Sequence, residues 1–416
     1  RNPSVAVIGA GMTGILMAIR LREAGITDIT ILEKADKLGG TWRENTYPGV
    51  ACDVPAHMYT YSFRGNPEWD YRFAHGDQIQ AYFEQVAAEY GVTEQIRFNE
   101  SLEESHYRDG KWDLRTSKGD EFSVDFVVAA TGILHHPAYP EIPGIDDFKG
   151  DMWHTARWNH DVDLAGKRVG IIGTGSTAVQ IISEISKTAG HLTVFQRTPQ
   201  WVARLPDKQY SEAEKAQLRG NERAMDKLRD RYSYFFSQTF TKAVSGGKLQ
   251  HAVLSWLVKR NVRKSVKDPV LRAKLTPDYK VGCKRLIFSN TFYDAMQRDN
   301  VYLETGGIDR IEEGGVATSD GQFHELDVLI LSTGFKPFSF MRPMELTGRD
   351  GLDIEQAWSK KVQAYRSVCL PGFPNFFLML GPNSPIGNYS VIAMSEVQSK
   401  YVLKLIDHWR AGTVET

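Results

Sequence analysis

The feature that most constrains the fold of this chain is a pattern that occurs twice, in which an apolar strand runs into a glycine cluster, a helix and a second strand. In the first copy, the strand Ser4–Ile8 is followed by apolar residues at helical spacing and by a strand at Asp28–Glu33. The second copy has Arg168–Ile172, Val179–Ile185 and His191–Gln196 in the same order. Each copy predicts a βαβ unit of a parallel sheet. We therefore expect an α/β fold with two Rossmann-like domains.

The first glycine cluster has the spacing of a dinucleotide-binding turn. Gly9, Gly11 and Gly14 lie between the strand and the helix, where glycine permits a tight turn, close backbone approach to a pyrophosphate and close packing of helix on strand. The amino end of the helix then faces the anion. Glu33 ends the second strand, where a carboxylate accepts hydrogen bonds from a ribose hydroxyl pair. This combination predicts an adenine dinucleotide site.

The second glycine cluster has Ala178 in its third place, which the pattern tolerates. Its second strand is followed by Arg197 and Thr198 rather than by a carboxylate. A cation with a hydroxyl donor suits the extra phosphate of NADPH, which a carboxylate would repel. We therefore predict FAD in the first unit and NADPH in the second, with hydride passing from the second to the first. The residues of the second turn that we expect at NADPH are Gly173, Thr174, Gly175, Ser176 and Thr177.

The length of 416 residues predicts more than one domain. Two further apolar strands, Phe126–Ala130 and Val328–Leu331, both lead to a Thr-Gly pair and indicate crossing points between domains. Ser211–Lys274 has apolar residues at helical intervals among many charges and predicts an inserted helical region, and Ser390–Trp409 predicts a last helix. The predicted divisions are an FAD domain at 1–145 and 326–416, an NADPH domain at 146–205 and 281–325, and a helical insertion at 206–280.

The charges of the chain almost cancel, with 50 basic and 51 acidic residues. This balance removes the strong positive field expected of a protein that binds nucleic acid or an anionic membrane surface. The sequence has no apolar run of about 18 residues and no signal-like segment, so we expect a cytoplasmic protein without stable membrane insertion. A solvated helix face explains one basic run, to which we assign no function. That run consists of Lys259, Arg260, Arg263, Lys264 and Lys267.

The three cysteines, Cys52, Cys283 and Cys369, are widely separated and include no C-x-x-C pair. We therefore expect neither a disulfide framework nor a redox dithiol, and no metal site. Reduced flavin passes electrons to a disulfide, a quinone or oxygen, and the lack of a cysteine pair argues against the first of these.

A more specific motif lies in the segment before the second glycine cluster. Phe148-x-Gly150-x-x-x-His154-x-x-x-Trp158 resembles the fingerprint of Baeyer-Villiger monooxygenases and lies where that family has it. Related N- and S-oxidising flavin monooxygenases usually carry Tyr or Phe at the last place, so Trp158 favours the Baeyer-Villiger branch. Asn159 departs from the Pro or Asp that is common in the family. The family implies a structural or conformational role for His154, not that of a general base.

Three further stretches are similar to motifs of the same family, so that the resemblance extends from Gly9 to Ser390. The first is a G-x-W-x-x-x-x-Y-P-G-x-x-x-D pattern, which in the family lies along the FAD. The second is a Lys-Arg element with an R-D-N-V continuation, and the third is a flavin-facing turn. The residues are Gly40, Thr41, Trp42, Tyr47, Pro48, Gly49 and Asp53, with Tyr59 nearby; Gly282–Arg285 and Arg298–Val301; and Gly381–Pro385.

The resemblance implies specific roles. Arg285 would lie over the flavin and stabilise a negative flavin peroxide, Asp53 would position Arg285, and Lys284 would help to hold the NADPH phosphate. An anionic peroxide, and the oxyanion formed when it attacks a carbonyl, both require a preorganised cation. The implied activity is an NADPH- and FAD-dependent conversion of ketones to esters or lactones, with molecular oxygen as co-substrate.

The sequence leaves the ketone and the oligomeric state open, and an aromatic content of 11% suggests a lipophilic substrate. The closest alternative is a monooxygenase that acts on nitrogen or sulfur. Others are an NADPH oxidase or reductase and a non-enzymatic flavin sensor, which is hard to reconcile with an NADPH site beside Arg285. Family members usually continue for several dozen residues with a loop that closes on NADP and substrate, and the sequence leaves open whether such a segment is missing here.

Overall fold

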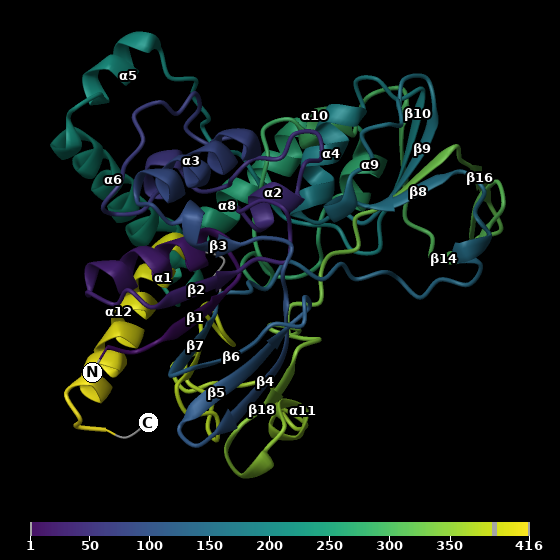
Figure 1. Cartoon of the computed structure of the whole chain (residues 1–416). Coiled ribbons are helices and arrows are strands. Elements are labelled where there is room, and N and C mark those ends of the chain that lie inside the picture. The colour runs from purple at the N-terminus through teal and green to yellow at the C-terminus, as the bar shows by residue number, and fades with distance from the viewer. Residues whose placement is uncertain (1, 385–388, 415–416) are drawn as a thin grey trace.

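A computed structural model, which describes residues 2–384 and 389–414, contains two five-stranded parallel sheets, three smaller sheets and a group of helices. Figure 1 shows the first parallel sheet in the middle of the molecule and the second at the opposite end from helices α5 (Glu212–Leu218) and α6 (Glu222–Phe236). A smaller four-stranded sheet, in which three strands are antiparallel, lies below the first parallel sheet in that view. The predicted fold class is confirmed.

The first parallel sheet has the strand order β19-β7-β1-β2-β3. Its order reverses at β1, because β2 and β3 follow on one side and β7 and β19 on the other. Ligands of open α/β sheets bind at such a switch point. Helices α1 and α12 run beside each other across this sheet (Figure 1). We call this sheet with its helices the first unit, and the second parallel sheet with its helices the second unit. The elements are β1 Val5–Ile8, α1 Met12–Glu23, β2 Ile29–Leu32, α3 Gly76–Glu89, β3 Ile96–Arg97, β7 Phe126–Ala129, β19 Phe376–Leu378 and α12 Val391–Arg410.

The second parallel sheet has the order β13-β10-β9-β17-β8. Strand β17 pairs with both β9 and β8, so the predicted boundary at residue 326 is wrong for this strand. Its apolar residues are buried between those two neighbours, and the chain leaves the second unit only after Leu331. The other predicted boundaries stay predictions. The elements are β8 Asp151–His154, β9 Arg168–Ile172, α4 Ser176–Ile185, β10 His191–Phe195, α10 Phe292–Ala295, β13 Val301–Glu304 and β17 Val328–Leu331.

Three smaller sheets accompany the parallel ones. The four-stranded sheet β18-β4-β5-β6 packs against the first unit through a core that contains Trp112 and Phe376. The strands are β4 Leu102–Arg108, β5 Lys111–Thr116, β6 Glu121–Val124 and β18 Glu345–Thr347; β14 Ile308–Glu312, β15 Gly315–Thr318 and β16 Phe323–Glu325; and β11 Val202–Ala203 with β12 Ile287–Phe288. The remaining short helices are α2 Thr41–Glu44 and α11 Ile354–Ala357.

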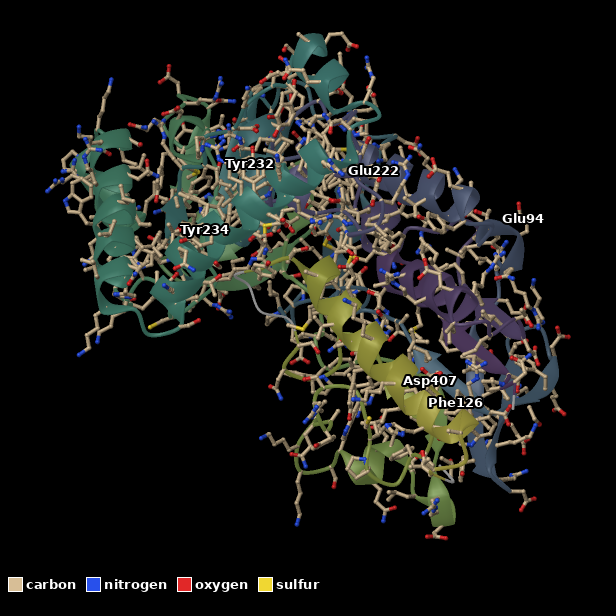
Figure 2. All side chains as sticks on the ribbon, turned by 90° about the vertical axis from the view of Figure 1, so that its left-hand side faces the viewer. Glu94, Phe126, Glu222, Tyr232, Tyr234 and Asp407 are labelled. Atoms are coloured by element: carbon tan, nitrogen blue, oxygen red, sulfur yellow. The ribbon has the colours of Figure 1, made fainter. Side chains whose placement is uncertain are left out.

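The predicted insertion is helical, and it reaches across to the first unit. Arg219 forms an ion pair with Glu68, and Met225 lies against Gly65, where an added Cβ would meet its sulfur at 3.1 Å. Figure 2 shows α6, with Glu222, Tyr232 and Tyr234 along it, on the same side of the molecule as α12. The helices are α5 Glu212–Leu218, α6 Glu222–Phe236, α7 Lys242–Val244, α8 Lys248–Ser265 and α9 Pro269–Lys274, with a π-helical turn at Ser237–Thr241. No helix in the described ranges is long and apolar enough to cross a membrane.

Two chain segments cross between the parallel sheets, residues 130–150 and residues 332–344, and backbone hydrogen bonds join them. The backbone N–H of Ala138 donates to Gly334 O, and that of Lys336 donates to His136 O. His154, which is 1% exposed, joins this crossing because its Nε2 lies 3.0 Å from the same Gly334 oxygen. Its Nδ1 accepts from the Ala156 N–H, so the ring is the neutral Nε2–H tautomer. The structural role that the resemblance implies for this histidine agrees with these contacts.

A loop of the first unit docks on helix α4 of the second. Tyr47 is buried in the core of the second unit, and its hydroxyl donates to Gln180 Oε1 at 3.0 Å. Gln180 Nε2 in turn donates to Ala51 O at 2.9 Å. At Gly49, which has φ +81°, an added Cβ would lie 3.1 Å from Gln180 O, so a side chain there would push the loop away. Gln180 therefore holds the loop that leads to Asp53.

We expect Gln180→Ala to lower the free energy of unfolding by about 1–3 kcal/mol, because it leaves a buried tyrosine hydroxyl and a backbone carbonyl without their partners. In a double-mutant cycle with Tyr47→Phe, the coupling should exceed about 0.5 kcal/mol. Denaturant unfolding measures both quantities. Lys187→Ala, just beyond the same helix, serves as the control. Additive effects of the two substitutions would contradict this coupling.

Burial lowers the pKa of His154 below its ordinary value. As the pH falls, His154 is therefore protonated more readily in the unfolded chain than in the folded protein. The contribution of the neutral ring to the free energy of unfolding is present above about pH 6.5 and is lost as the pH falls below it. We expect the free energy of unfolding of His154→Gln to fall less steeply than that of the unsubstituted protein between about pH 6.5 and 5. Urea unfolding across this range tests it, with the exposed His408→Gln as control. A slope equal to that of the unsubstituted protein would contradict the assignment.

Candidate active site

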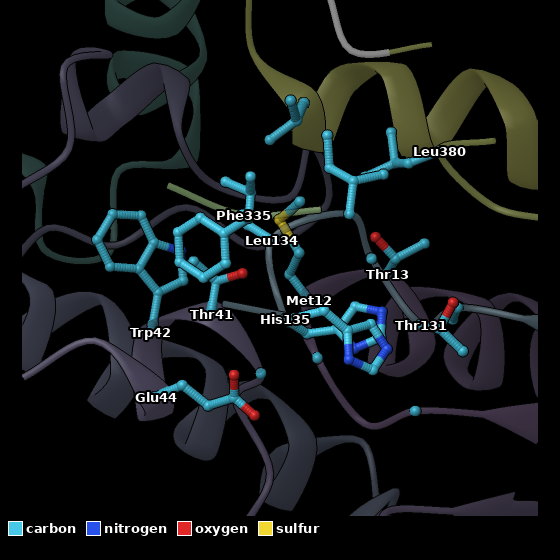
Figure 3. A pocket seen from close by; sticks show the side chains of 18 of the residues that line it. Met12, Thr13, Thr41, Trp42, Glu44, Thr131, Leu134, His135, Phe335 and Leu380 are labelled. Atoms are coloured by element: carbon cyan, nitrogen blue, oxygen red, sulfur yellow. The ribbon is translucent and has the colours of Figure 1, made fainter. Parts of the chain in front are cut away.

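A cavity of about 910 Å³ opens where the first sheet reverses its strand order and extends to the start of α4. This volume lies in the upper part of the range for ligand and cofactor sites. The close-up in Figure 3 shows Met12 and Thr13 from the first turn, Thr41 and Trp42 from α2, and Leu380. Both predicted dinucleotide motifs therefore face one cavity.

The first glycine turn has the geometry that its spacing predicts. Gly9 has φ +101°, and an added Cβ would lie 2.8 Å from Ala130 O. A Cβ on Gly14 would lie 1.8 Å from Gly9 O, so this position admits no side chain. Gly11 faces Gly40 at the cavity wall, where a Cβ added to Gly11 would lie 3.6 Å from Gly40 Cα. The turn thus brings bare backbone and the amino end of α1 to the cavity, as a pyrophosphate requires.

Glu33 lines the cavity with a carboxylate that is only 4% exposed as a residue. Its Oε2 accepts from the Ala10 N–H at 2.8 Å, and its Oε1 accepts from the Ala35 N–H and from Arg43 at 3.0 Å each. Three donors leave one of the roughly four acceptor positions of a carboxylate for a ribose hydroxyl. The position fits the predicted adenine dinucleotide.

Two aromatic side chains of the second motif touch each other beside the cavity. Trp42 Nε1 donates to Tyr59 Oη at 3.2 Å, and the two rings meet edge to face with their centroids 5.7 Å apart. Tyr59 Oη also lies 3.7 Å from Met12 Sδ, next to the glycine turn. Burial raises the pKa of the Tyr59 hydroxyl, so it stays protonated. The motif thereby fixes one wall of the cavity.

The second glycine turn differs in what surrounds it. Gly173 has φ +113°, and an added Cβ would lie 2.4 Å from Ser332 O. A Cβ on Gly175 would meet nothing within 4 Å, because this glycine faces the cavity together with Ser176 and Thr177. Thr174 turns away and donates to Thr198 O at 3.0 Å. The open space at Gly175, at the amino end of α4, is where a second pyrophosphate would fit.

Arg197 and Lys284 are exposed residues that do not line the cavity. The Lys284 ammonium lies 4.8 Å from the centre of the Tyr279 ring, and the Tyr279 hydroxyl donates to Gln200 Oε1 at 3.0 Å. Through Tyr279, the Lys284 side chain therefore lies near Gln200, in the segment that follows β10. Within residues 2–384 and 389–414, neither cation has an ion-pair partner. Two cations without carboxylates suit a phosphate monoester.

Arg285 reaches from the Lys-Arg element to the first unit. Its Nη2 lies 2.7 Å from Asp53 Oδ2, and the Arg285 side chain is 54% exposed at the cavity. The charge of Asp53 raises the pKa of Arg285, so the guanidinium stays charged at every relevant pH. Cys52, the neighbour of Asp53, is buried with a raised thiol pKa, and all three cysteines are free. The predicted pair is therefore present, with the cation facing open space.

Sequence reasoning missed much of the apolar wall. No motif contains Leu134 and His135 of the first crossing segment, Phe335 of the second, or the two phenylalanines Phe236 and Phe240 of the insertion. They approach the cavity only because segments distant in the sequence fold together, so spacing gave no signal for them. In contrast, Gly14, Gly173, Thr174, Arg197, Thr198 and Lys284 were predicted but do not line this cavity.

The predicted flavin-facing turn is described as far as Ser384, and Pro385 lies outside the described residues. Leu380 lines the cavity, and its N–H donates to Gln398 Oε1 of α12 at 2.8 Å. Gln398 Nε2 donates to Ser384 Oγ at 2.7 Å. Tyr389 and Val391 also line the cavity, so the amino end of α12 faces it.

Comparison with known proteins agrees with this arrangement. Residues 2–409 match the family model of the flavin-binding monooxygenase-like proteins. An uncharacterised monooxygenase of Mycobacterium tuberculosis is 47% identical over all of this chain and 84% of its own length. A Baeyer-Villiger monooxygenase of Streptomyces coelicolor is 41% identical over 96% of this chain and 77% of its own.

A solved steroid monooxygenase with bound NADP has the same fold, with a TM-score of 0.88 and 30% identity, over 99% of this chain and 87% of its own. The two glycine turns, the shared cavity and these similarities lead to one conclusion. The chain belongs to the flavin-binding monooxygenase-like family and is similar to its Baeyer-Villiger monooxygenases.

Proposed function

We propose that this protein is an FAD- and NADPH-dependent Baeyer-Villiger monooxygenase that converts a lipophilic ketone to an ester or lactone. The observation that carries the proposal is the Arg285–Asp53 pair at 2.7 Å, which presents a permanent cation to a cavity shared by two dinucleotide turns. The similarity to a named Baeyer-Villiger monooxygenase and to an NADP-bound steroid monooxygenase supports it.

The cavity residues fit the two nucleotides in different ways. Gly9, Gly11 and Glu33 would hold the adenine side of FAD, with Trp42 and Tyr59 along it. Gly175, Ser176 and Thr177 would contact the NADPH pyrophosphate, with its extra phosphate between Arg197, Thr198 and Lys284. Bound FAD supplies the redox chemistry, accepting hydride from NADPH and reacting with molecular oxygen.

The contribution of the protein is to place charge where the reaction develops it. When a ketone carbonyl is attacked, negative charge grows on its oxygen, and a fixed cation lowers the energy of that state. Arg285 is suited to this because Asp53 fixes its guanidinium on one side while the other side faces the cavity. The aromatic and aliphatic wall, including Leu134, Phe335 and Phe240, favours a lipophilic substrate.

The test of this function is rapid mixing of the NADPH-reduced holoenzyme with oxygen while the flavin absorbance is followed and ketones are screened for ester products. A transient spectrum that a ketone consumes faster, with an ester formed, is the expected outcome. A thioether in the same screen tests the alternative of sulfur oxidation. Immediate return of oxidised flavin with stoichiometric hydrogen peroxide, whatever the substrate, would mean an oxidase instead.

We expect Arg285→Ala to keep detectable NADPH oxidation and to lower ester formation by about 100- to 1,000-fold or more, because the cation that offsets the developing charge is gone. Product analysis and NADPH consumption, measured together, separate the two effects. Arg310→Ala is the control, since Arg310 forms an exposed ion pair with Asp309 elsewhere in the second unit. Ester formation at an undiminished rate in Arg285→Ala would remove this role from Arg285.

A further inference from the structure

Helix α8 of the insertion has two apolar faces, and only one of them is covered. Leu254, Val258 and Val262 are spaced by four residues and pack into the core of the second unit. Leu249, Val253 and Trp256 are exposed, at 72%, 50% and 58%.

The exposed residues form a stripe opposite the packed face. At about 100° per residue, positions 249, 253 and 256 share one side of the helix, and positions 254, 258 and 262 share the other. Leu257, which is 48% exposed, widens the stripe at its edge. Single exposed apolar residues are ordinary, but a contiguous stripe on one helix face marks an interaction surface.

The segment that carries this stripe is basic. The segment from Arg231 to Lys267 contains eight basic residues and no Asp or Glu, although the whole chain has 51 acidic residues. None of the cations of α8 and of the turn after it forms an ion pair with the described part of the chain. These exposed cations are Lys248, Lys259, Arg260, Arg263, Lys264 and Lys267.

Apolar and basic groups follow each other along the same exposed face. Arg260 lies one turn beyond Trp256, and its guanidinium is 5.3 Å from the centre of the indole ring. Arg263 and Lys264 continue this side toward the end of the helix. Trp and Leu together with Lys and Arg are the residue types with which helices bind in the plane of a membrane interface.

We propose that this face of α8 docks on an anionic lipid surface, with Leu249, Val253 and Trp256 entering the headgroup boundary and the cations contacting lipid phosphates. A second copy of the chain fits the surface less well. A two-fold dimer through α8 would bring two segments of eight basic residues and no acidic ones against each other. An anionic bilayer neutralises the same charges.

The helical insertion that carries α8 also lines the cavity, so docking on lipid would bring the cavity close to the bilayer. Phe236 at the end of α6 and Phe240 in the π-helical turn line the cavity, while their neighbours Tyr234 and Phe235 are 69% and 60% exposed. The insertion is therefore both a wall of the cavity and the part of the chain that would rest on the lipid. Delivery of a lipophilic ketone from the bilayer rests on the proposed function, whereas docking itself does not.

Vesicle flotation of the holoenzyme tests docking directly. We expect the protein to float with vesicles of equal parts phosphatidylglycerol and phosphatidylcholine, and not with phosphatidylcholine alone. Raising the salt from about 0.1 M to about 1 M should release it, because the screening length falls from about 10 Å to about 3 Å. The assay uses no substrate, so its failure leaves the proposed function untouched.

Two variants locate the surface. The double variant Leu249→Ser with Trp256→Ser should bind anionic vesicles at least about tenfold more weakly, and so should Arg263→Glu with Lys264→Glu. Tyr302→Ser with Phe323→Ser, two exposed aromatics of the second unit, should bind like the unsubstituted protein. All these side chains are exposed, and thermal unfolding checks that the variants fold.

Three outcomes would overturn the proposal. One is no flotation with anionic vesicles at low salt. Another is undiminished flotation of the Leu249 and Trp256 double variant. The third is a dimer, seen by light scattering, that this variant dissociates while vesicles bind neither form.

Discussion

The contact between the loop at residues 47–53 and helix α4 determines where the rest of the active site lies. This loop belongs to the unit of the first glycine turn, yet Tyr47 is buried in the core of the second. Gln180 holds both the tyrosine hydroxyl and the Ala51 carbonyl, and two residues later Asp53 meets Arg285. This contact joins the two units beside the cavity that both turns share. The Asp53 carboxylate orients Arg285, and the position of Asp53 depends in turn on helix α4 of the second unit.

Much of the fold could be predicted because the two sheets are built from buried parallel strands. Such strands are short apolar runs that end in glycine turns, and β9 and β17 have the bounds that the sequence indicates. The sequence did not predict to which of the two sheets β17 belongs. A run of four apolar residues is equally suited to either core, and the pairing of β17 with β9 and β8 depends on how the chain crosses between the units. The antiparallel strands β4 to β6 alternate buried and exposed residues over only short stretches, so their signal is weak.

The site shows the same division between local and long-range information. A glycine that admits no Cβ, such as Gly14, is required by the turn itself, so its spacing in the sequence is sufficient to find it. The apolar wall imposes no such requirement. Phe240 and Leu134 come from the insertion and from a crossing segment, and many other apolar residues would pack there as well. Lys284 is intermediate, since its charge was informative but its position beside the segment that follows β10 depends on the contacts of Tyr279 with Lys284 and with Gln200.

Net charge is informative only when charges are mixed along the chain. The near-equality of basic and acidic residues argued against a strongly positive surface for the chain as a whole. This argument fails for residues 231–267 of the insertion, which contain eight basic residues and no carboxylate. Screening limits each charge to roughly 10 Å at moderate salt, so a surface such as that of α8 is governed by its own cations and not by acidic residues on the distant sheets. An interpretation of the basic run as a solvated face accounts for its exposure, but it leaves the apolar stripe of Leu249, Val253 and Trp256 on the same helix unexplained.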